Sequence, residues 1–463
     1  MSYNGLIRKL LDLDWTKMPN MLILVLLFFI SRTPFLNLGF GTDPDAWRIA
    51  ISAFNLNYFH IYQTSRFPGY PVPEFFNSLV INHGWFATNS LTMLLALISV
   101  IGFAMILKEL NIKNKGLLVI TYAFLPVIWI NSTNTMDYMW AAAFIMFVWY
   151  FIIKKQYVLA GLMMGLAIGS RITSIILIFP FIYLILNDNN EKIRKITYFL
   201  MSMSIMALIL FLPLLIQYGL GFLSYYPTSV GTSKISEDLN QLGLIALLWG
   251  ILIFLISTGN LVDKVRKNDK FFIFLLFVVF LVSIMYIGAP YDAGYLIPAI
   301  PFGLVLLSSI SKRKLFTIFC ALLLLNSFIS FELSNGTAPT IKEGLVLKDA
   351  EIRDKLTNVM ERMVESNISD TIIISAEYIP ILLYLDEKSQ ENPEFIEMNN
   401  DKMYWNLKKN RSYIYLLSSD KIKYWQKKGY KIYYMGSSAM EITRLNYNYS
   451  LTDYNCSNIF AFY

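Results

Sequence analysis

The run MLILVLLFFI at residues 21–30 belongs to a long apolar segment, and similar segments recur as far as residue 331. The chain is 56% hydrophobic and only 15% charged, whereas soluble domains carry about 25% charged residues. Segments of this length and purity are typical of transmembrane helices. The sequence therefore predicts a mainly α-helical, polytopic membrane protein. The predicted spans, about eleven, are 19–37, 89–107, 116–132, 138–153, 156–169, 172–187, 196–217, 241–258, 270–288, 292–310 and 314–332.

Lysine and arginine gather in alternate breaks between these segments, for example at Lys154 and Lys155. Basic residues near span ends are retained in the cytoplasm. The N-terminus is therefore predicted to be cytoplasmic, with loops of about 38–88 and 218–240 outside. The net charge of +7 reflects this topology, and because the basic residues form no single patch, nucleic acid is excluded as a partner.

Three regions divide the chain: a membrane body over 1–332, a linker over 333–345, and a region over 346–463 without a span. Strand-like and helical runs alternate in the last region, which predicts a soluble α/β domain on the outer side. It contains no nucleotide-binding motif, so a structural cap or an acceptor-docking domain is expected. The runs are TIIISA (371–376), EYIPILLYLDE (377–387), SYIYLLSS (412–419), DKIKYWQKKG (420–429) and KIYYMG (431–436).

Glycine and cysteine usage adds two expectations. Gly161, Gly165 and Gly169 recur at every fourth residue, a spacing that permits close packing of membrane helices. Two cysteines form no disulfide framework, and two histidines exclude a multi-histidine metal site.

The stretch GFGTDPDAWRIA (39–50) places two acids and an arginine where the chain leaves its first span. Ionisable residues at span ends are costly unless they serve a function. Arginine holds phosphate through its planar fork, and a carboxylate can act as a general base. Together with the aromatic residues of this loop, these groups suit a phosphate-linked sugar presented from the bilayer.

At these residues the chain resembles the GT-C glycosyltransferases, which transfer sugars from polyprenyl-phosphate donors. The resemblance covers about 1–310 and is nearest to the protein-mannosyltransferase and aminoarabinose-transferase branch. The stretches that carry it are FGTDPDAWR (40–48), SRFPGYPVPEFF (65–76), NTMDYMWAAAF (134–144), LAGLMMGLAIGSRITS (159–174) and GYLIPAIP (294–301).

The resemblance implies roles for individual residues. Asp43 corresponds to the catalytic base or its partner, and Asp45 is the alternative. Arg66 matches the basic residue near the donor phosphate, and Arg171 would be a second phosphate contact. Asp43 and Asp45 would also be the ligands of a divalent cation, Mg²⁺ or Mn²⁺, if one is used. The expected substrate-binding residues are Trp47, Arg48, Tyr70, Asp137, Tyr291, Asp292 and Tyr295.

Several of these residues also have a structural interpretation. Asp45, or with less weight Asp43, would cap a helix that starts near Ala46, and Asp137 would cap the fourth span. Arg48 would form a surface ion pair with Asp43 or Asp45. Arg171 would extend to lipid headgroups, while Tyr291 and Tyr295 would belong to an interfacial aromatic belt.

The function predicted from the sequence is transfer of a sugar from a polyprenyl-phosphate donor to a lipid, glycan or protein acceptor at the outer membrane face, with inversion. Two alternatives remain. A polysaccharide polymerase or ligase would depend on an outer arginine rather than on Asp43. A transporter or flippase would place charges at mid-membrane, where the predicted spans are nearly free of them.

Overall fold

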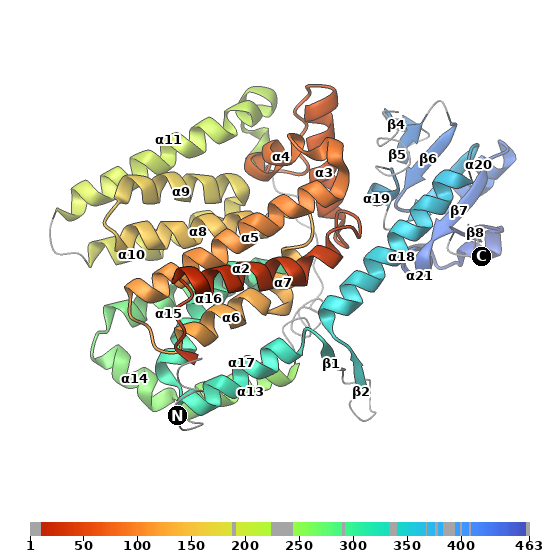
Figure 1. Cartoon of the computed structure of the whole chain (residues 1–463). Coiled ribbons are helices and arrows are strands. Elements are labelled where there is room, and N and C mark those ends of the chain that lie inside the picture. Colours follow the sequence, from red (N-terminus) through yellow and green to blue (C-terminus); the bar gives the residue numbers. More distant parts are fainter. Residues whose placement is uncertain are drawn as a thin grey trace.

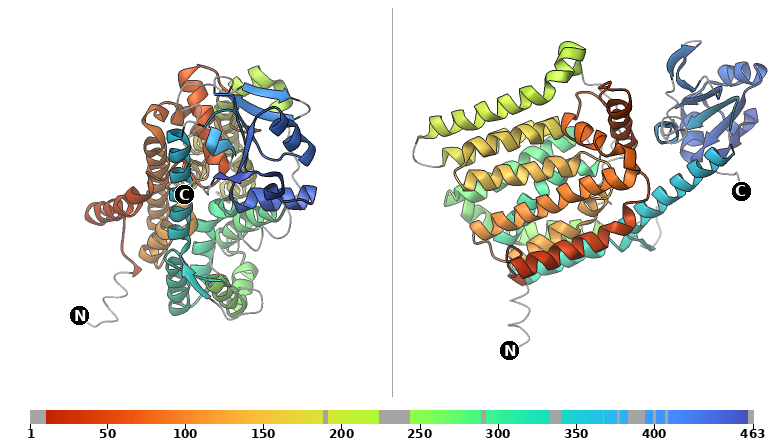
Figure 2. Two further views of the ribbon diagram at one scale, coloured as in Figure 1. Left: turned by 90° about the vertical axis from the view of Figure 1, so that its right-hand side faces the viewer. Right: turned by 45° about the horizontal axis from the view of Figure 1, so that its top comes forward.

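The computed structural model describes residues 11–187, 191–223, 244–288, 292–332, 340–366, 368–375, 378–382, 394–398, 401–406 and 409–459. A body of helices is followed by a small unit of strands and helices at one end of the body (Figure 1). The long helix α18 (Leu345–Glu365) leads from the body to this unit, as two further views also show (Figure 2).

Among the residues that the structure describes, five helical segments are long and apolar enough to cross a membrane, and a pair of helices bent by 55° would add a sixth. Each of the eleven predicted spans contains an apolar helix, so the mainly helical membrane class is confirmed, while the number of crossings stays a prediction. The helices of the body are α2 (Met18–Arg32), η1 (Thr33–Phe35), α3 (Pro44–Tyr58), α4 (Pro71–Ser78), η2 (Ile81–His83), α5 (Gly84–Glu109), α6 (Lys115–Phe124), α7 (Pro126–Asn131), α8 (Tyr138–Ile153), α9 (Tyr157–Ser170), η3 (Ile172–Leu177), α10 (Ile178–Leu186), α11 (Lys192–Tyr218), η4 (Gly219–Leu223), α13 (Leu244–Ile256), α14 (Thr258–Arg266), α15 (Lys270–Gly288), η5 (Ala293–Ala299), α16 (Ile300–Ile310) and α17 (Arg313–Leu325).

The predicted span 116–132 is two helices, α6 and α7, rather than one. The helix breaks before Pro126 because proline lacks the N–H group of a continuing helix and clashes with the preceding turn. Side chains satisfy the carbonyl groups freed at the break: the buried Arg32 donates to the Ala123 carbonyl, and Ser327 Oγ donates to the next one at 3.2 Å. Arg32 therefore has a structural role.

The predicted span 314–332 is wrong at its C-terminal end. α17 ends at Leu325, and the alternating sequence that follows forms strand β1 (Ile329–Glu332). Strand β2 (Thr340–Glu343) pairs with it antiparallel. The second half of the predicted linker is therefore a hairpin strand, and α18 begins directly after it.

The predicted outer loop 38–88 is largely helical and holds α3 and α4. The other predicted outer loop, 218–240, contains η4, and its remainder lies outside the described residues. α3 and α4 lie at the end of the body that also carries α18 (Figure 1).

The glycine spacing on α9 has the predicted consequence. α9 packs against α11 so closely that a Cβ added at Gly161 would lie 2.2 Å from the Phe199 carbonyl oxygen. A Cβ at Gly165 would lie 2.6 Å from Met206 Cβ, and one at Gly169 would lie 2.6 Å from Leu210 Cδ1. The absent side chains allow the two helices to approach each other.

The C-terminal unit is a six-stranded sheet of order β4-β5-β6-β3-β7-β8. β3 pairs parallel with β6 and β7, β7 pairs parallel with β8, and the pairs of β4 with β5 and of β5 with β6 are antiparallel. Its elements are β3 (Thr371–Ser375), α19 (Tyr378–Leu382), β4 (Glu394–Met398), β5 (Asp401–Asn406), β6 (Arg411–Ile414), α20 (Ser419–Lys427), β7 (Lys431–Met435), α21 (Gly436–Tyr447), η7 (Leu451–Tyr454) and β8 (Ser457–Asn458).

Both faces of the central strand β3 are buried, and one of them packs in the same hydrophobic core as the helical body. Successive strand residues point to opposite faces. Ile372 and Ile374 enter a core with Trp425 of α20, whereas Ile373 enters the main core of the protein with Met360 of α18. One hydrophobic core therefore runs from the helical body through α18 into the sheet.

We expect Gly161→Ala to lower the thermal unfolding temperature of the purified protein in detergent. The added methyl group must push α11 away, and overpacking of this kind costs about 1–3 kcal/mol. Gly259→Ala on α14 is the matched control, because a Cβ there meets no atom within 4 Å. Equal unfolding temperatures for the two variants would contradict the close packing of α9 against α11.

Candidate active site

The segment GTDPDAWR folds locally as the start of α3. Pro44 is the first helical residue, a position where proline is favoured, and Asp43 is the N-cap, with Oδ1 accepting a hydrogen bond from the Asp45 N–H at 2.8 Å. The prediction that Asp45 caps a helix beginning at Ala46 is therefore wrong. Asp45 lies in the first turn, and its carboxylate is available to other partners.

Asp45 is held by two arginines. Its Oδ1 accepts from Arg48 Nη1 at 2.7 Å, and its Oδ2 lies 3.0 Å from Arg66 Nε. The predicted pairing of Arg48 with an acid of this segment is confirmed, and Asp45 is that acid. Arg48 is partly exposed, so its pair contributes little to stability.

Arg66 reaches the site from a turn that a buried acid organises. The Arg66 carbonyl accepts from the Gly69 N–H at 2.8 Å, and Gly69 adopts a φ of +99° that favours glycine. Glu74 is fully buried and accepts hydrogen bonds from the Ser65 N–H at 2.8 Å and from the Tyr62 hydroxyl at 2.5 Å. Sequence reasoning missed Glu74, although an acid directly after two closely spaced prolines in YPVPEFF was a signal.

Asp137 is the buried centre of the site. Its Oδ1 accepts from Arg66 Nη2 at 3.1 Å, and its Oδ2 accepts from Arg171 Nη1 at 2.5 Å. Asp137 occupies the N-cap position of α8, but its side chain makes no capping bond. Arg171 follows α9 and is only 3% exposed, so the alternative that it extends to lipid headgroups is wrong.

Aromatic rings flank both arginines. The Arg66 guanidinium carbon lies 4.0 Å from the centre of the Tyr70 ring. Arg171 lies between Tyr138 and Tyr295, at 4.0 and 4.1 Å from the ring centres. These are cation–π distances. Tyr295 therefore has a partner inside the site, and Tyr138, which sequence reasoning missed, follows Asp137 directly in NTMDYMW.

Asp292 caps η5, with its carboxylate accepting from the Gly294 N–H. It lies near enough to Asp43 to affect the ionisation of that carboxyl group. Tyr291 lies outside the described residues.

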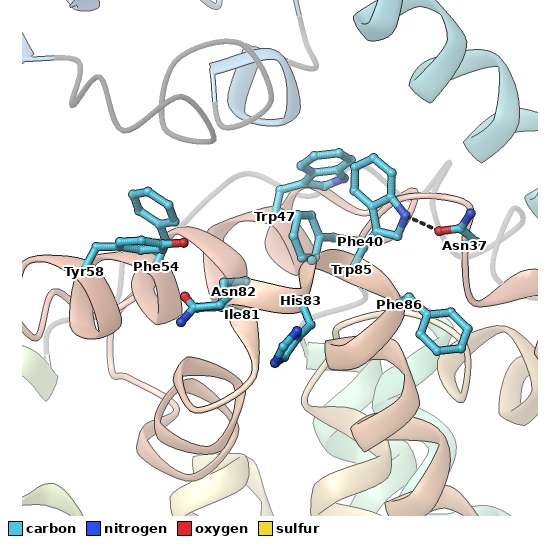
Figure 3. Close-up of a pocket in the computed structure, with 11 residues that line it drawn as sticks. Asn37, Phe40, Trp47, Phe54, Tyr58, Ile81, Asn82, His83, Trp85 and Phe86 are labelled. Carbon is cyan, nitrogen blue, oxygen red and sulfur yellow. Dashed lines mark hydrogen bonds between the residues drawn. The ribbon is translucent and has the colours of Figure 1, made fainter.

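Trp47 lies apart from the other predicted substrate-binding residues. It is fully buried, and its Nε1 donates to the Gly41 carbonyl at 2.8 Å. The ring belongs to the wall of a separate cavity of about 520 Å³ between α3, η2 and the start of α5 (Figure 3). The lining residues of this cavity are Asn37, Phe40, Trp47, Phe54, Tyr58, Ile81, Asn82, His83, Gly84, Trp85 and Phe86.

The electrostatic environment separates the two acids of α3. Burial, together with the neighbouring carboxylates of Asp45 and Asp292, raises the pKa of the Asp43 carboxyl to about 7, while the hydrogen bond from the Asp45 N–H and the charge of Arg66 act to lower it. Two arginines hold Asp45 in its ionised form. Asp43 is thus the acid of this pair that can exchange a proton near neutral pH.

Both arginines keep one buried hydrogen-bond donor that is unused. Arg66 Nη1 and Arg171 Nε are buried, and neither has a hydrogen-bond partner among the residues that the structure describes. A buried donor without a partner costs free energy, so an anion that accepts from both would be favoured here.

The predicted metal ligands fit a cation poorly. Both oxygens of Asp45 are engaged by arginines, and in the described part of the chain no three His, Cys, Asp or Glu side chains form a group that could hold a metal ion. Hard cations need several free oxygen ligands.

A body of apolar helices with a buried arginine–carboxylate cluster at one end defines an integral membrane protein with a polar site. Residues 72–217 match the model of the dolichyl-phosphate-mannose-protein mannosyltransferase family. The matched range contains Glu74, Asp137 and Arg171. The match confirms the resemblance to this family over residues 72–217 and indicates a membrane glycosyltransferase of the GT-C type, while the resemblance at residues 40–48 and 294–301 stays a prediction. No curated protein and no solved structure matches the chain.

We expect Asp137→Asn to lower the free energy of unfolding by about 3–5 kcal/mol, because it leaves the buried Arg171 without its carboxylate and Arg66 with Asp45 alone. Thermal unfolding in detergent measures this loss. The matched control is Glu191→Gln, which removes the carboxylate of an exposed ion pair with Arg194 and should change stability little. Equal stability of the two variants would contradict the central role of Asp137.

Proposed function

We propose that the protein transfers a sugar from a polyprenyl-phosphate donor to an acceptor at the extracytoplasmic face of the membrane. The observation that carries the proposal is a pair of arginines, each with a buried and unused donor, beside a carboxyl group whose pKa lies near neutrality. The family match over residues 72–217 supports the class of reaction.

Arg66 and Arg171 would bind the donor phosphate. Asp137 bridges the two guanidinium groups and fixes their orientation, while Arg66 Nη1 and Arg171 Nε remain free to donate. Phosphate accepts strongly from arginine. As the bond between the sugar and the phosphate breaks, negative charge grows on the leaving phosphate, and preorganised donors stabilise that charge.

Asp43 would be the general base. Its carboxylate takes the proton from the acceptor hydroxyl or amine as that group attacks the anomeric carbon. The bond from the anomeric carbon to the phosphate oxygen breaks, and polyprenyl phosphate leaves with the electron pair. A single displacement of this kind inverts the anomeric configuration. Asp45 is a positioning residue, because its two ion pairs join the start of α3 to Arg66.

The remaining residues of the site would contact the substrates. Tyr70 and Tyr295 face the guanidinium groups, and Arg48 and Asp292 lie on segments that meet Asp43. The outer location follows from the distribution of lysine and arginine, which retains the opposite ends of the helices in the cytoplasm. The acceptor is a lipid, a glycan or a protein.

We expect Asp43→Asn to abolish sugar transfer while polyprenyl phosphate still binds. The assay follows a labelled polyprenyl-phosphate hexose and a membrane extract as acceptor. Asp354→Asn, an exposed acid on α18, is the matched control and should transfer at the wild-type rate.

The same assay tests two further parts of the mechanism. The anomeric configuration of the product should be inverted, and EDTA should leave transfer unchanged because arginines occupy both oxygens of Asp45. Transfer by Asp43→Asn at the wild-type rate, or a product of retained configuration, would overturn the proposed role of Asp43.

The pH dependence of transfer follows from the raised pKa of Asp43. A general base works only when it is deprotonated, so kcat/KM should rise with pH, reach half of its plateau near pH 7, and fall about tenfold per pH unit below that. Initial rates between pH 5 and pH 9 with an alcohol acceptor, which does not titrate in this range, measure the profile. A flat profile from pH 5 to pH 7 would exclude Asp43 as the base.

A further inference from the structure

The helix that carries the C-terminal unit contacts the segments that hold the site. Arg353, in the middle of α18, is 1% exposed. Its Nε donates to the Leu38 carbonyl at 3.1 Å, and its Nη2 donates to the carbonyls of Gly39 at 3.1 Å and Thr133 at 2.9 Å. Asp349 lies one turn earlier on the same face and accepts from the Thr42 hydroxyl at 2.9 Å. We call this set of bonds the α18 contact.

The α18 contact joins the two segments that present the acids of the site. Thr42 directly precedes Asp43, and Thr133 lies shortly before Asp137. The Thr135 N–H also donates to the Phe40 carbonyl at 2.7 Å, so the two segments are bonded to each other beneath α18.

The backbone at Gly39 packs closely against α18. Gly39 has a φ of +83°, and a Cβ added there would lie 3.0 Å from Thr357 Cγ2, one turn after Arg353. Asn89 Nδ2 donates to the same Gly39 carbonyl at 2.9 Å. Glycine, which has no Cβ, adopts this positive φ so close to the Thr357 side chain without strain.

We propose that α18 positions the catalytic segment, and that Arg353 is a positioning residue for sugar transfer. Its guanidinium donates to three carbonyl groups, of which those of Gly39 and Thr133 are bonded in buried surroundings, and a buried carbonyl that loses a donor costs free energy. Loss of these bonds lets residues 38–42 move, and Asp43 moves with them relative to Asp137 and its arginines. The C-terminal unit thereby takes part in the reaction through α18, although none of its side chains needs to contact the substrate.

The part of this inference that concerns catalysis rests on the proposed function. Arg353→Gln should lower kcat by about 10- to 100-fold, because a displacement of about 1 Å in a reacting group has effects of this size. The affinity for polyprenyl phosphate should stay unchanged, since Arg66 and Arg171 are intact. Arg353→Lys and Thr42→Val, which remove fewer of the bonds, should lower kcat less.

Amide hydrogen exchange tests the contact independently of turnover. Exchange should become faster in residues 38–43 and 131–137 of Arg353→Gln and stay unchanged elsewhere in the body. Lys355→Gln is the matched control, because Lys355 lies exposed on the same helix and pairs with Glu351 at 2.5 Å.

The outcomes separate the two hypotheses. Wild-type kcat and wild-type exchange in Arg353→Gln would overturn the positioning role and leave the transferase in place. Faster exchange throughout the body, with phosphate affinity lost together with kcat, would show a general structural role and also overturn it. No transfer by the wild-type protein would reject the proposed function, and the exchange pattern alone would then decide whether the α18 contact holds the two segments.

Discussion

The site depends on one buried carboxylate, Asp137, which bridges Arg66 and Arg171. Two guanidinium groups cannot lie together in a protein interior without a counter-charge, since each uncompensated buried charge costs several kcal/mol. Asp137 supplies the counter-charge and uses one oxygen for each arginine. The pairing leaves one further N–H direction on each arginine unused, so the same interaction that stabilises the cluster also prepares it for an anion.

Around this centre, the protein uses backbone capping and buried acids to place each group. The cap at Asp43 fixes the start of α3, Glu74 fixes the turn that carries Arg66, and Asp45 connects the two by ion pairs. The two acids of GTDPDAWR thus differ in role: Asp45 stays charged between arginines, whereas burial and neighbouring carboxylates raise the pKa of Asp43. Their environments, rather than their residue type, separate the proposed base, Asp43, from the proposed positioning residue, Asp45.

Helix α18 links the site to a part of the chain that looks separate in the sequence. The core runs from the body through Met360 into Ile373 of the sheet, and the buried Arg353 bonds to the segments before Asp43 and Asp137. The C-terminal unit is thus packed and hydrogen-bonded to the segments that hold the site. This explains why the predicted linker contains a paired strand and leads directly into a helix.

The sequence by itself determined the membrane class, the positions of most of the apolar helices, the close glycine contact of α9 and several residues of the site, among them Asp45, Arg66, Asp137 and Arg171. These are local properties, because hydrophobicity, glycine spacing and polar residues at helix ends can be read within a few turns of chain. Only the tertiary structure decided that Asp43 rather than Asp45 is the cap, that Trp47 faces another cavity, and that Glu74, Tyr138 and Arg353 belong to the arrangement. Arg66 and Asp137 are 71 residues apart. Ion pairs and carbonyl contacts over such separations depend on how turns and helices pack in space, and no local pattern specifies that.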